Sequence, residues 1–489
     1  MNEIRFVDTT LRDGHMSLWA SNMTTGMMLP IAARLDGAGF EAFELMSGAH
    51  FKKAVRELKE DPFERIRLIA ERMPGTPMRM IVGKINVFGF DPLSMFRLFM
   101  ELAASNGMRQ ARISDPWNAL DGWSFRIAVA REVGMDAVLN LTFSISPRHT
   151  DEYYAERTRN ATTLPITGLC IKDPGGLLTP ERTRSLVPAV LANADGIPVE
   201  FHTHCTTGLG PLCCLEALKL GIETINTAIP PLADGASNPS IFNLAANARA
   251  LGFSPMIDEE ALRPVSAHFT DIAGREGFPI GAPVEFDYTQ YLHQVPGGMI
   301  SNLEHQLRLV GLEDRMAQTL EETARVRAEL GYPIMVTPLS QFVGSQAAIN
   351  VILGERYRQV TDQVIEYALG YWGEEGAAAM DPDLKDRILG THRARELTRV
   401  EPPEPSLAEM RRIHGGVGVS DKEMLLRWLT SREDVDTMNA AAAPRAYSGK
   451  SQPLIELIEA LTRRRDRSFI QVRKPGFSLT LGGRGGSRE

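Results

Sequence analysis

The sequence predicts an α/β fold: a (β/α)8 TIM barrel over residues 1–257, then a mostly helical C-terminal module and a small α+β extension. Eight short apolar runs alternate with stretches whose apolar residues recur every three or four positions. Eight such units in about 250 residues are what this barrel requires. The competing architecture, a doubly wound sheet, is weakened because no Gly-x-Gly-x-x-Gly segment follows any of the runs.

The predicted strands are spaced so that a helix fits between each pair. They span residues 4–9, 42–46, 78–82, 111–114, 137–143, 168–171, 198–202 and 224–228. Stretches such as residues 27–37 and 64–72 have the apolar spacing of helices.

After the barrel the pattern changes three times. Residues 258–399 have a mostly helical pattern and form the second predicted domain. Residues 400–406, VEPPEPS, are typical of a proline-rich linker. Residues 407–489 form a C-terminal extension, with a helix at 453–464, a strand-like end at 469–481 and a glycine-rich tail that predicts disorder. We expect the extension either to dock a partner or to pack on the barrel.

The composition is that of a soluble globular enzyme, with 43% hydrophobic and 23% charged residues. The net charge of −8 argues against nucleic acid as the main partner. No apolar run is long enough for a transmembrane helix, and the N-terminus begins with a strand rather than a signal peptide. The four cysteines form neither a disulfide framework nor a Cys-x-x-Cys zinc motif, so we expect reduced thiols and a cytoplasmic location.

Polar and charged residues collect at or near the carboxyl ends of the predicted strands. Barrel enzymes build their active sites at this face, and charges scattered for solubility alone would show no such bias. The residues are Arg12, Asp13, Glu44, Asn86, Asp115, Asn118, Lys172, Asp173, His202 and His204. The pattern therefore predicts an active site at this end of the barrel.

Asp13, Lys172, His202 and His204 are the candidate ligands of a divalent metal. Side chains alternate along a strand, so His202 and His204 point to one side. A carboxylate and two neutral imidazoles suit a cation that keeps positions open for substrate. Lys172 could bind a metal after losing its charge, for example as a carbamate made with carbon dioxide. Its alternative role is a structural ion pair with Asp173.

Several motifs, in one order, resemble the carboxyltransferases of biotin-dependent enzymes: the oxaloacetate decarboxylase alpha subunit, the transcarboxylase 5S subunit and the central domain of pyruvate carboxylase. The resemblance covers roughly residues 4–395. The motifs are DTTLRD, LPIAARLDGAGF, EDPFERIR, RISDPWN, IKDPGGLLTP, FHTHCTTG, YLHQVPGGMISNL and VTPLSQFVG.

The resemblance implies roles for particular residues. Zinc, manganese or cobalt would be held by Asp13, a carbamylated Lys172, His202 and His204. Thr337 would carry a proton between biotin and substrate, and Arg12 would lie beside the developing enolate. Carboxyl transfer to carbon needs such an enolate, which a Lewis acid favours by polarising a carbonyl.

The substrate pocket departs from the family pattern. Met16 stands where the family has a glutamine, and Phe90 where it has a tyrosine. Gly83, with Lys84 beside it, replaces the arginine that binds pyruvate, and Lys52 replaces an aspartate. Because glycine cannot clamp a carboxylate as arginine does, we expect a carbonyl substrate that is not pyruvate in the usual pose. The predicted substrate-binding positions are Met16, Glu44, Gly83, Lys84, Asn86 and Phe90.

The chain has no Ala-Met-Lys-Met biotin-attachment motif and no room for an ATP-grasp domain. The resemblance therefore implies a separate biotin carboxyl carrier protein and a separate biotin carboxylase, with a homodimer as a further expectation.

The alternative function is a biotin-independent aldolase or lyase of the same barrel superfamily. Those enzymes share the Arg-Asp pair, the strand-two glutamate and the His-x-His, and they lack the metal lysine and the Val-Thr-Pro module. A third reading, a non-enzymatic scaffold descended from such an enzyme, would require that the metal ligands be lost, and all four are present.

Overall fold

The computed structural model describes residues 2–86, 91–295, 303, 307–308, 311–398, 404–442, 447, 469–474 and 477–482. The chain forms two compact units, Met1–Pro444 and Arg445–Glu489. Within the described residues, no helix is both long enough and apolar enough to cross a membrane. The four cysteines are free and buried.

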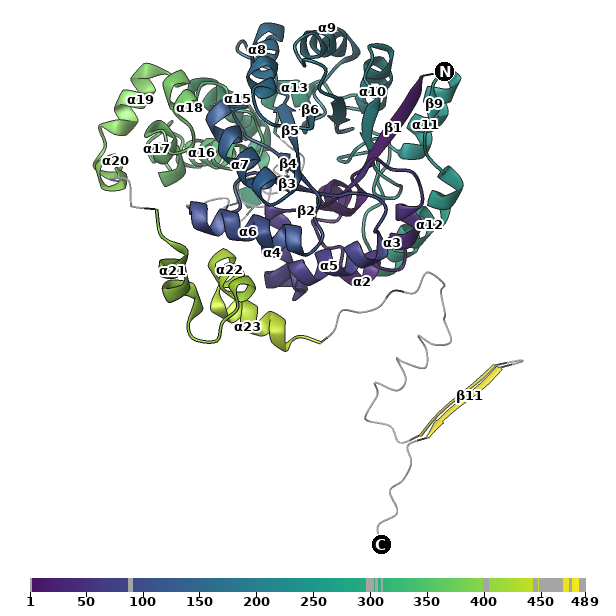
Figure 1. Cartoon of the computed structure of the whole chain (residues 1–489). Coiled ribbons are helices and arrows are strands. Elements are labelled where there is room, and N and C mark those ends of the chain that lie inside the picture. Colours follow the sequence, from purple (N-terminus) through teal and green to yellow (C-terminus); the bar gives the residue numbers. More distant parts are fainter. Residues whose placement is uncertain are drawn as a thin grey trace. The chain divides into compact units, whose positions relative to one another are not determined.

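Eight parallel strands form a closed barrel in the first unit (Figure 1). Neighbouring strands pair in chain order, and β1 pairs with both β2 and β8, which closes the barrel. The strands are β1 (Glu3–Asp8), β2 (Ala42–Ser47), β3 (Met78–Val82), β4 (Gln110–Ile113), β5 (Asp136–Thr142), β6 (Gly168–Asp173), β7 (Val199–Thr203) and β8 (Thr224–Thr227). A short β9 (Ser254–Pro255) pairs with the start of β1. The predicted barrel is confirmed.

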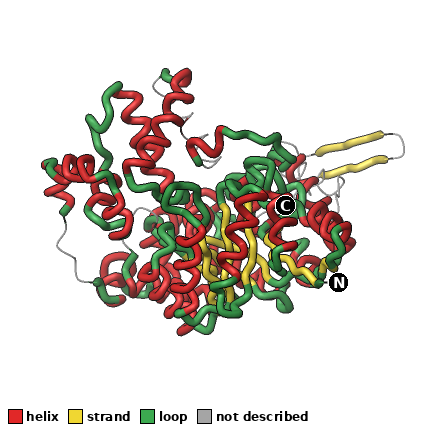
Figure 2. Tube along the Cα trace, turned by 90° about the horizontal axis from the view of Figure 1, so that it is seen from above, coloured by secondary structure: helices red, strands yellow, loops and turns green. Residues whose placement is uncertain are grey.

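Helices surround the strands, as the view in Figure 2 shows. They are α2 (Thr25–Met28), α3 (Ala32–Asp36), α4 (Gly48–Lys53), α5 (Pro62–Arg72), α6 (Leu93–Ser105), α7 (Leu120–Glu132), α8 (Asp151–Thr162), α9 (Pro180–Leu191), α10 (Gly210–Lys219), α11 (Ile241–Ala250) and α12 (Glu259–Glu276). α5 begins where Asp61 accepts hydrogen bonds from the first-turn amides and Pro62 takes the first helical position. The helix predicted over residues 27–37 is divided into α2 and α3, because Pro30 has no amide hydrogen to continue it.

The barrel continues into a helical module with its own apolar core. Its helices are α13 (Thr289–His293), α15 (Met316–Glu329), α16 (Leu339–Leu353), α17 (Asp362–Ala368), α18 (Glu374–Ala379), α19 (Pro382–Leu389) and α20 (His392–Leu397). Trp117, from the loop after β4, packs into this core against Tyr367. Glu375 in turn binds Arg148 and Arg157 of the barrel. These contacts hold the module against the barrel.

The predicted extension is divided between the two units. α21 (Leu407–Met410), α22 (Asp421–Leu429) and α23 (Arg432–Ala440) belong to the first unit, where Lys422 binds Asp61 and Asp434 binds Arg56. In the second unit β10 (Phe469–Lys474) and β11 (Phe477–Gly482) form an antiparallel hairpin over the strand-like end. Residues 400–403, 453–464 and 483–489 lie outside the described residues. The boundaries at 257, 399 and 406 remain predictions.

Candidate metal centre and active site

Asp13 lies at the carboxyl end of β1, in a single π-helical turn, η1 (Thr10–Gly14). Its side chain is buried. Ser17 donates to Oδ1 at 3.3 Å, and Arg12 contacts Oδ2 at 2.8 Å. Burial alone would raise the pKa of Asp13, but the neighbouring Arg12 and His204 hold it well below its usual value. The group is therefore a carboxylate, with Oδ2 turned toward two histidines.

His202 lies one residue before the end of β7, and His204 directly follows that end. The Nε2 atom of His202 lies 3.2 Å from Asp13 Oδ2, and that of His204 lies 3.3 Å from the same oxygen. Burial lowers the pKa of His202 to about 3, so this imidazole is neutral. Two ring nitrogens and one carboxylate oxygen therefore meet at one point.

The other ring nitrogens fix the tautomers. His204 Nδ1 lies 2.7 Å from the Ala236 carbonyl oxygen, which can accept a hydrogen bond but not donate one. His202 Nδ1 lies 3.0 Å from Asn226 Oδ1, and Asn238 Nδ2 lies 3.2 Å from His202 Nε2. Both Nδ1 atoms therefore carry the proton, and both Nε2 atoms present a lone pair.

These donors suit a divalent metal. Within the part of the chain that the structure describes, Asp13, His202 and His204 are the one group of three or more Asp, Glu, His or Cys residues placed to hold an ion. A cation stabilises three electron-pair donors that have no proton between them. Metal-binding imidazoles usually donate the N–H of their other ring nitrogen to an oxygen acceptor, and both Nδ1 atoms have such an acceptor here.

Lys172 lies beside His202, since the two residues are register partners on β6 and β7. Burial, and then the charge of Arg12, lowers the pKa of its ammonium to about 8. Asp173 points elsewhere: its carboxylate accepts hydrogen bonds from the Leu177 and Leu178 amides and from the Thr203 hydroxyl. No ion pair joins Lys172 to Asp173 within the described ranges.

Arg12 and Glu44 form a buried ion-pair network under the metal ligands. Arg12 Nε donates to Glu44 Oε2 at 2.9 Å, and Arg112 binds the other oxygen of the same carboxylate. Arg112 Nε also donates to Asn140 at 2.7 Å. Burial would raise the pKa of Glu44, but the two arginines lower it well below its usual value. Glu44 therefore positions Arg12 rather than facing an open pocket.

The other predicted substrate positions lie around the barrel mouth. Met16 follows Asp13 in α1 (His15–Leu18) and is exposed. Lys84 Nζ lies 4.2 Å from the centre of the Trp372 ring in the helical module. Asn86 Oδ1 accepts from Lys52 Nζ at 2.7 Å. A Cβ on Gly83 would lie 3.2 Å from the Ser114 carbonyl oxygen, so a larger side chain is crowded there.

Two further positions complete the predicted site. Phe90 lies outside the described residues. Thr337 immediately precedes the α16 segment and its side chain is exposed. The structure thus brings Asp13, His202, His204, Lys172 and Arg12 together. Among the residues that the structure describes, no hydrogen bond or ion pair joins Thr337 to them.

Two family models match the chain in succession: an HMGL-like model over residues 3–268 and a conserved carboxylase domain over residues 291–439. A pyruvate carboxylase subunit from Methanothermobacter thermautotrophicus is 35% identical over 86% of this chain and 75% of its own. The methylmalonyl-CoA carboxyltransferase 5S subunit of Propionibacterium freudenreichii is 30% identical over 78% and 75%. The chain belongs to the biotin-dependent carboxyltransferases.

A solved structure agrees with this assignment. The carboxyl transferase domain of Rhizobium etli pyruvate carboxylase, with pyruvate, has a TM-score of 0.79 and 25% identity, over 90% of this carboxyltransferase and 78% of that chain. The relatives support the carboxyltransferase activity and not the aldolase or lyase that was the alternative. This chain is an enzyme subunit of that kind.

Sequence reasoning missed the residues that orient the carboxyltransferase's histidines. Asn226 carried a usable signal, because it is a polar residue inside the buried strand β8. Asn238 lies in a loop and Ala236 contributes only its backbone carbonyl, so no sequence pattern pointed to either residue.

Two predicted residues of the site lie elsewhere. Asp115 and Asn118 hydrogen-bond the backbone of the loop after β4 and of β5 instead of facing the metal ligands.

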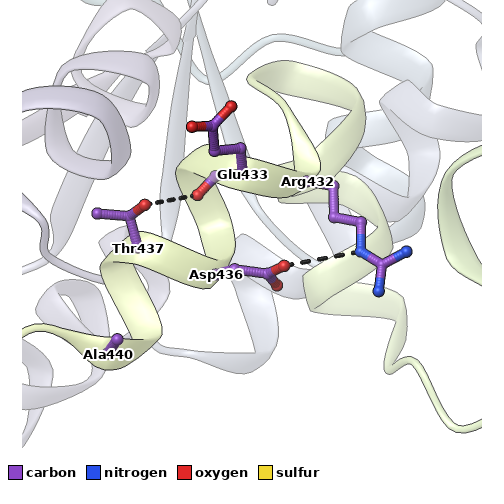
Figure 3. Close-up of a pocket in the computed structure, with 5 residues that line it drawn as sticks. All are labelled: Arg432, Glu433, Asp436, Thr437 and Ala440. Carbon is purple, nitrogen blue, oxygen red and sulfur yellow. Dashed lines mark hydrogen bonds and ion pairs between the residues drawn. The ribbon is translucent and has the colours of Figure 1, made fainter.

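A hollow on α23 of this carboxyltransferase is lined by none of the site residues (Figure 3). Arg432 pairs with Asp436 at 3.6 Å, and the Thr437 hydroxyl donates to the Glu433 carbonyl at 2.8 Å. Both contacts join positions four apart on one helix, which is the usual arrangement on an exposed helix surface.

Proposed function

We propose that this chain transfers a carboxyl group between carboxybiotin, brought by a separate carrier protein, and a carbonyl substrate that forms an enolate. The observation that carries this proposal is the convergence of Asp13 Oδ2 with the lone pairs of His202 Nε2 and His204 Nε2. Family membership supports a biotin carrier and a biotin carboxylase as partners. Cytoplasmic location and a homodimer remain predictions.

Asp13, His202 and His204 would hold zinc, manganese or cobalt. A bound divalent metal supplies Lewis-acid polarisation of the substrate carbonyl. We propose Lys172 as the fourth ligand, in the form of a carbamate. Its lowered pKa leaves part of the amine neutral near pH 7, and a neutral amine can add to carbon dioxide and release a proton.

The chain's other residues would handle charge and protons. Arg12 is held rigidly by Glu44 and Asp13, so its positive charge is in place before charge develops on the substrate oxygen. Thr337 would relay a proton between biotin and substrate, and a neutral hydroxyl does this without burying another charge. The Thr337 assignment rests on the family motif.

The acceptor is proposed not to be pyruvate in the usual pose. Gly83 offers no guanidinium for a carboxylate, and Met16 offers no amide. With the carrier and the biotin carboxylase supplied, pyruvate is expected to be carboxylated slowly and without saturation. A saturable, efficient pyruvate reaction would contradict this.

The proposed function is tested by purifying the chain from its native host, probing the bound proteins with streptavidin and measuring metal content. A stoichiometric biotinylated partner, together with about one metal ion per chain, is the expected result. Bound metal without any biotinylated partner would instead favour a biotin-independent enzyme of the barrel superfamily.

A further inference from the structure

Arg327 lies on α15, is only 5% exposed, and has neutral hydrogen-bond partners. Its Nε donates to the Pro333 carbonyl at 3.0 Å, and its Nη2 donates to the Ser144 hydroxyl at 2.9 Å and to the Ile145 carbonyl at 3.0 Å. No carboxylate pairs with Arg327 in the part of the chain that the structure describes, and burial lowers the pKa of its guanidinium to about 10. Burying a charge without an opposite charge costs free energy, so these hydrogen bonds must offset that cost.

The two barrel residues that bind Arg327 follow the strand next to Lys172. Thr142, at the end of β5, is the register partner of Lys172 on β6. The Phe143 amide donates to the Lys172 carbonyl at 2.7 Å, and Ser144 is the next residue. Arg327 therefore binds the β5 loop two residues beyond the strand position that pairs with the proposed fourth metal ligand.

The third partner of Arg327 belongs to residues 331–337, which we call the Thr337 segment. Pro333 lies four residues before Thr337, and a Cβ on Gly331 would lie 2.5 Å from a carbonyl oxygen of α18, so the segment is closely packed. The Thr337 side chain itself is exposed and forms no hydrogen bond with a residue of the described ranges. The backbone path of the segment therefore decides where the Thr337 hydroxyl lies.

A second arginine makes a weaker link between the same two parts of the chain. Arg148, in the β5 loop, donates from Nη1 to the Gly331 carbonyl at 3.0 Å, and its Nη2 binds Glu375 at 2.7 Å. Its side chain is 30% exposed, so water can replace a lost contact. Removal of the buried Arg327 would instead leave the buried Pro333 carbonyl without this donor, which makes Arg327 the firmer link.

We propose that Arg327 is a positioning residue for carboxyl transfer, which fixes the Thr337 segment relative to the barrel strand beside Lys172. This role rests on the function proposed above, because Thr337 is the proposed proton relay. A guanidinium suits the role, since its planar fork donates in several fixed directions, whereas a lysine ammonium is a point charge on a flexible chain. A misplacement of about 1 Å can lower a rate about 100-fold, so loss of this link should slow the transfer step.

Electron–electron double resonance measures the positioning without any turnover. Spin labels are attached at Thr337→Cys and Leu251→Cys, since Leu251 is 46% exposed after α11 and the four native cysteines are buried. Arg327→Met should shift or widen the distance distribution by about 1 Å or more. Arg325→Met is the matched control on the same helix, because Arg325 pairs with Glu321 at the surface. Equal distributions in the two variants would overturn the proposal.

Carboxyl transfer gives a second readout, with the carrier charged by the biotin carboxylase from labelled bicarbonate and pyruvate as the acceptor probe. Arg327→Met should lower the transfer rate about 100-fold at unchanged metal content, and Arg325→Met should keep the wild-type rate. Arg327→Lys should regain about 10-fold at most, because it lacks the fork. In Arg327→Ala, guanidinium at about 10 mM should restore part of the rate, whereas it would weaken a variant that had only lost stability.

Thr337→Ala separates this role from the function on which it rests. If Thr337→Ala transfers carboxyl groups at the full rate, the relay assignment is wrong, and the label distances still decide whether Arg327 positions the segment. If Thr337→Ala is inactive while Arg327→Met keeps the full rate, Arg327 is not a positioning residue. A loss of metal that matches the loss of rate in Arg327→Met would also overturn the proposal, because Arg327 would then act on the fold of the barrel.

Discussion

At the scale of single residues, the two metal-site histidines are oriented in different ways. His204 is held by a backbone carbonyl, whereas His202 depends on the side chain of Asn226. Asn226 also accepts from Arg112 and lies 3.3 Å from Glu200, so its amide orientation is fixed from three sides. The position that most sharply controls the geometry of His202 is therefore one that binds no metal itself.

Asn226→Ala is expected to weaken metal binding about 10–100-fold, because His202 loses the acceptor that fixes its tautomer. Titration of metal-free protein with zinc measures this. Asn140→Ala is the matched control, since it removes another amide partner of Arg112 and leaves His202 untouched. Equal metal affinities in the two variants would show that Asn226 does not orient the ligand.

Lys172→Ala is expected to lower metal affinity and to remove a carbamate signal. Carbon-13 NMR of the metal-loaded wild type under labelled carbon dioxide should show that signal. Lys52→Ala should keep it, since the Lys52 ammonium is bound to Asn86 instead. Wild-type protein with full metal content and no carbamate carbon would contradict the assignment of Lys172.

At the scale of elements, the strands could be predicted within about two residues, because apolar β-rich runs and their turn residues are local signals. The division of the helix predicted over residues 27–37 also has a local cause, because Pro30 has no amide hydrogen to donate. The contacts of Lys84 with Trp372 and of Trp117 with Tyr367 could not be predicted, since they join distant segments. The ligand set could be predicted from the residue types at the strand ends and from the family motifs, whereas the partners that fix the two imidazole rings came from the structure.

Glu375 is expected to be the main polar link between α18 and the barrel, because it binds both Arg148 and Arg157 at 2.7 Å. Glu375→Ala leaves two partly buried arginines without their partner and should destabilise the module's docking by about 1–2 kcal/mol. Hydrogen exchange of the α18 amides measures this. Glu374→Ala, at an exposed neighbouring position, should leave exchange unchanged, and equal rates in both variants would contradict the link.

At the scale of the whole molecule, stability should decrease in mild acid. Burial, and then Arg327 and Arg148, lowers the pKa of His149 from 6.5 to about 3. Between these values the unfolded chain binds a proton that the folded chain does not. The free energy of unfolding therefore falls as the pH falls, by up to about 1.4 kcal/mol per pH unit.

His149→Gln should reduce this slope between about pH 6.5 and pH 4 in urea unfolding of metal-free protein. His392→Gln is the control, because that imidazole is 80% exposed, and it should keep the wild-type slope. If His149→Gln also kept the wild-type slope, the buried imidazole would be titrating normally in the folded chain.

The closure of the barrel also sets an order of events during synthesis. Asp13 and His204 are 191 residues apart in sequence, and Thr9 hydrogen-bonds Asn238, 229 residues later. On the ribosome, β1 must therefore wait with an unpaired edge until β8 has emerged, and metal cannot assist the early stages of folding. Such long-range pairing is slow and exposes strand edges to aggregation. Supplying metal during expression should consequently improve the yield of the finished chain far more than the yield of truncated chains that end before β7.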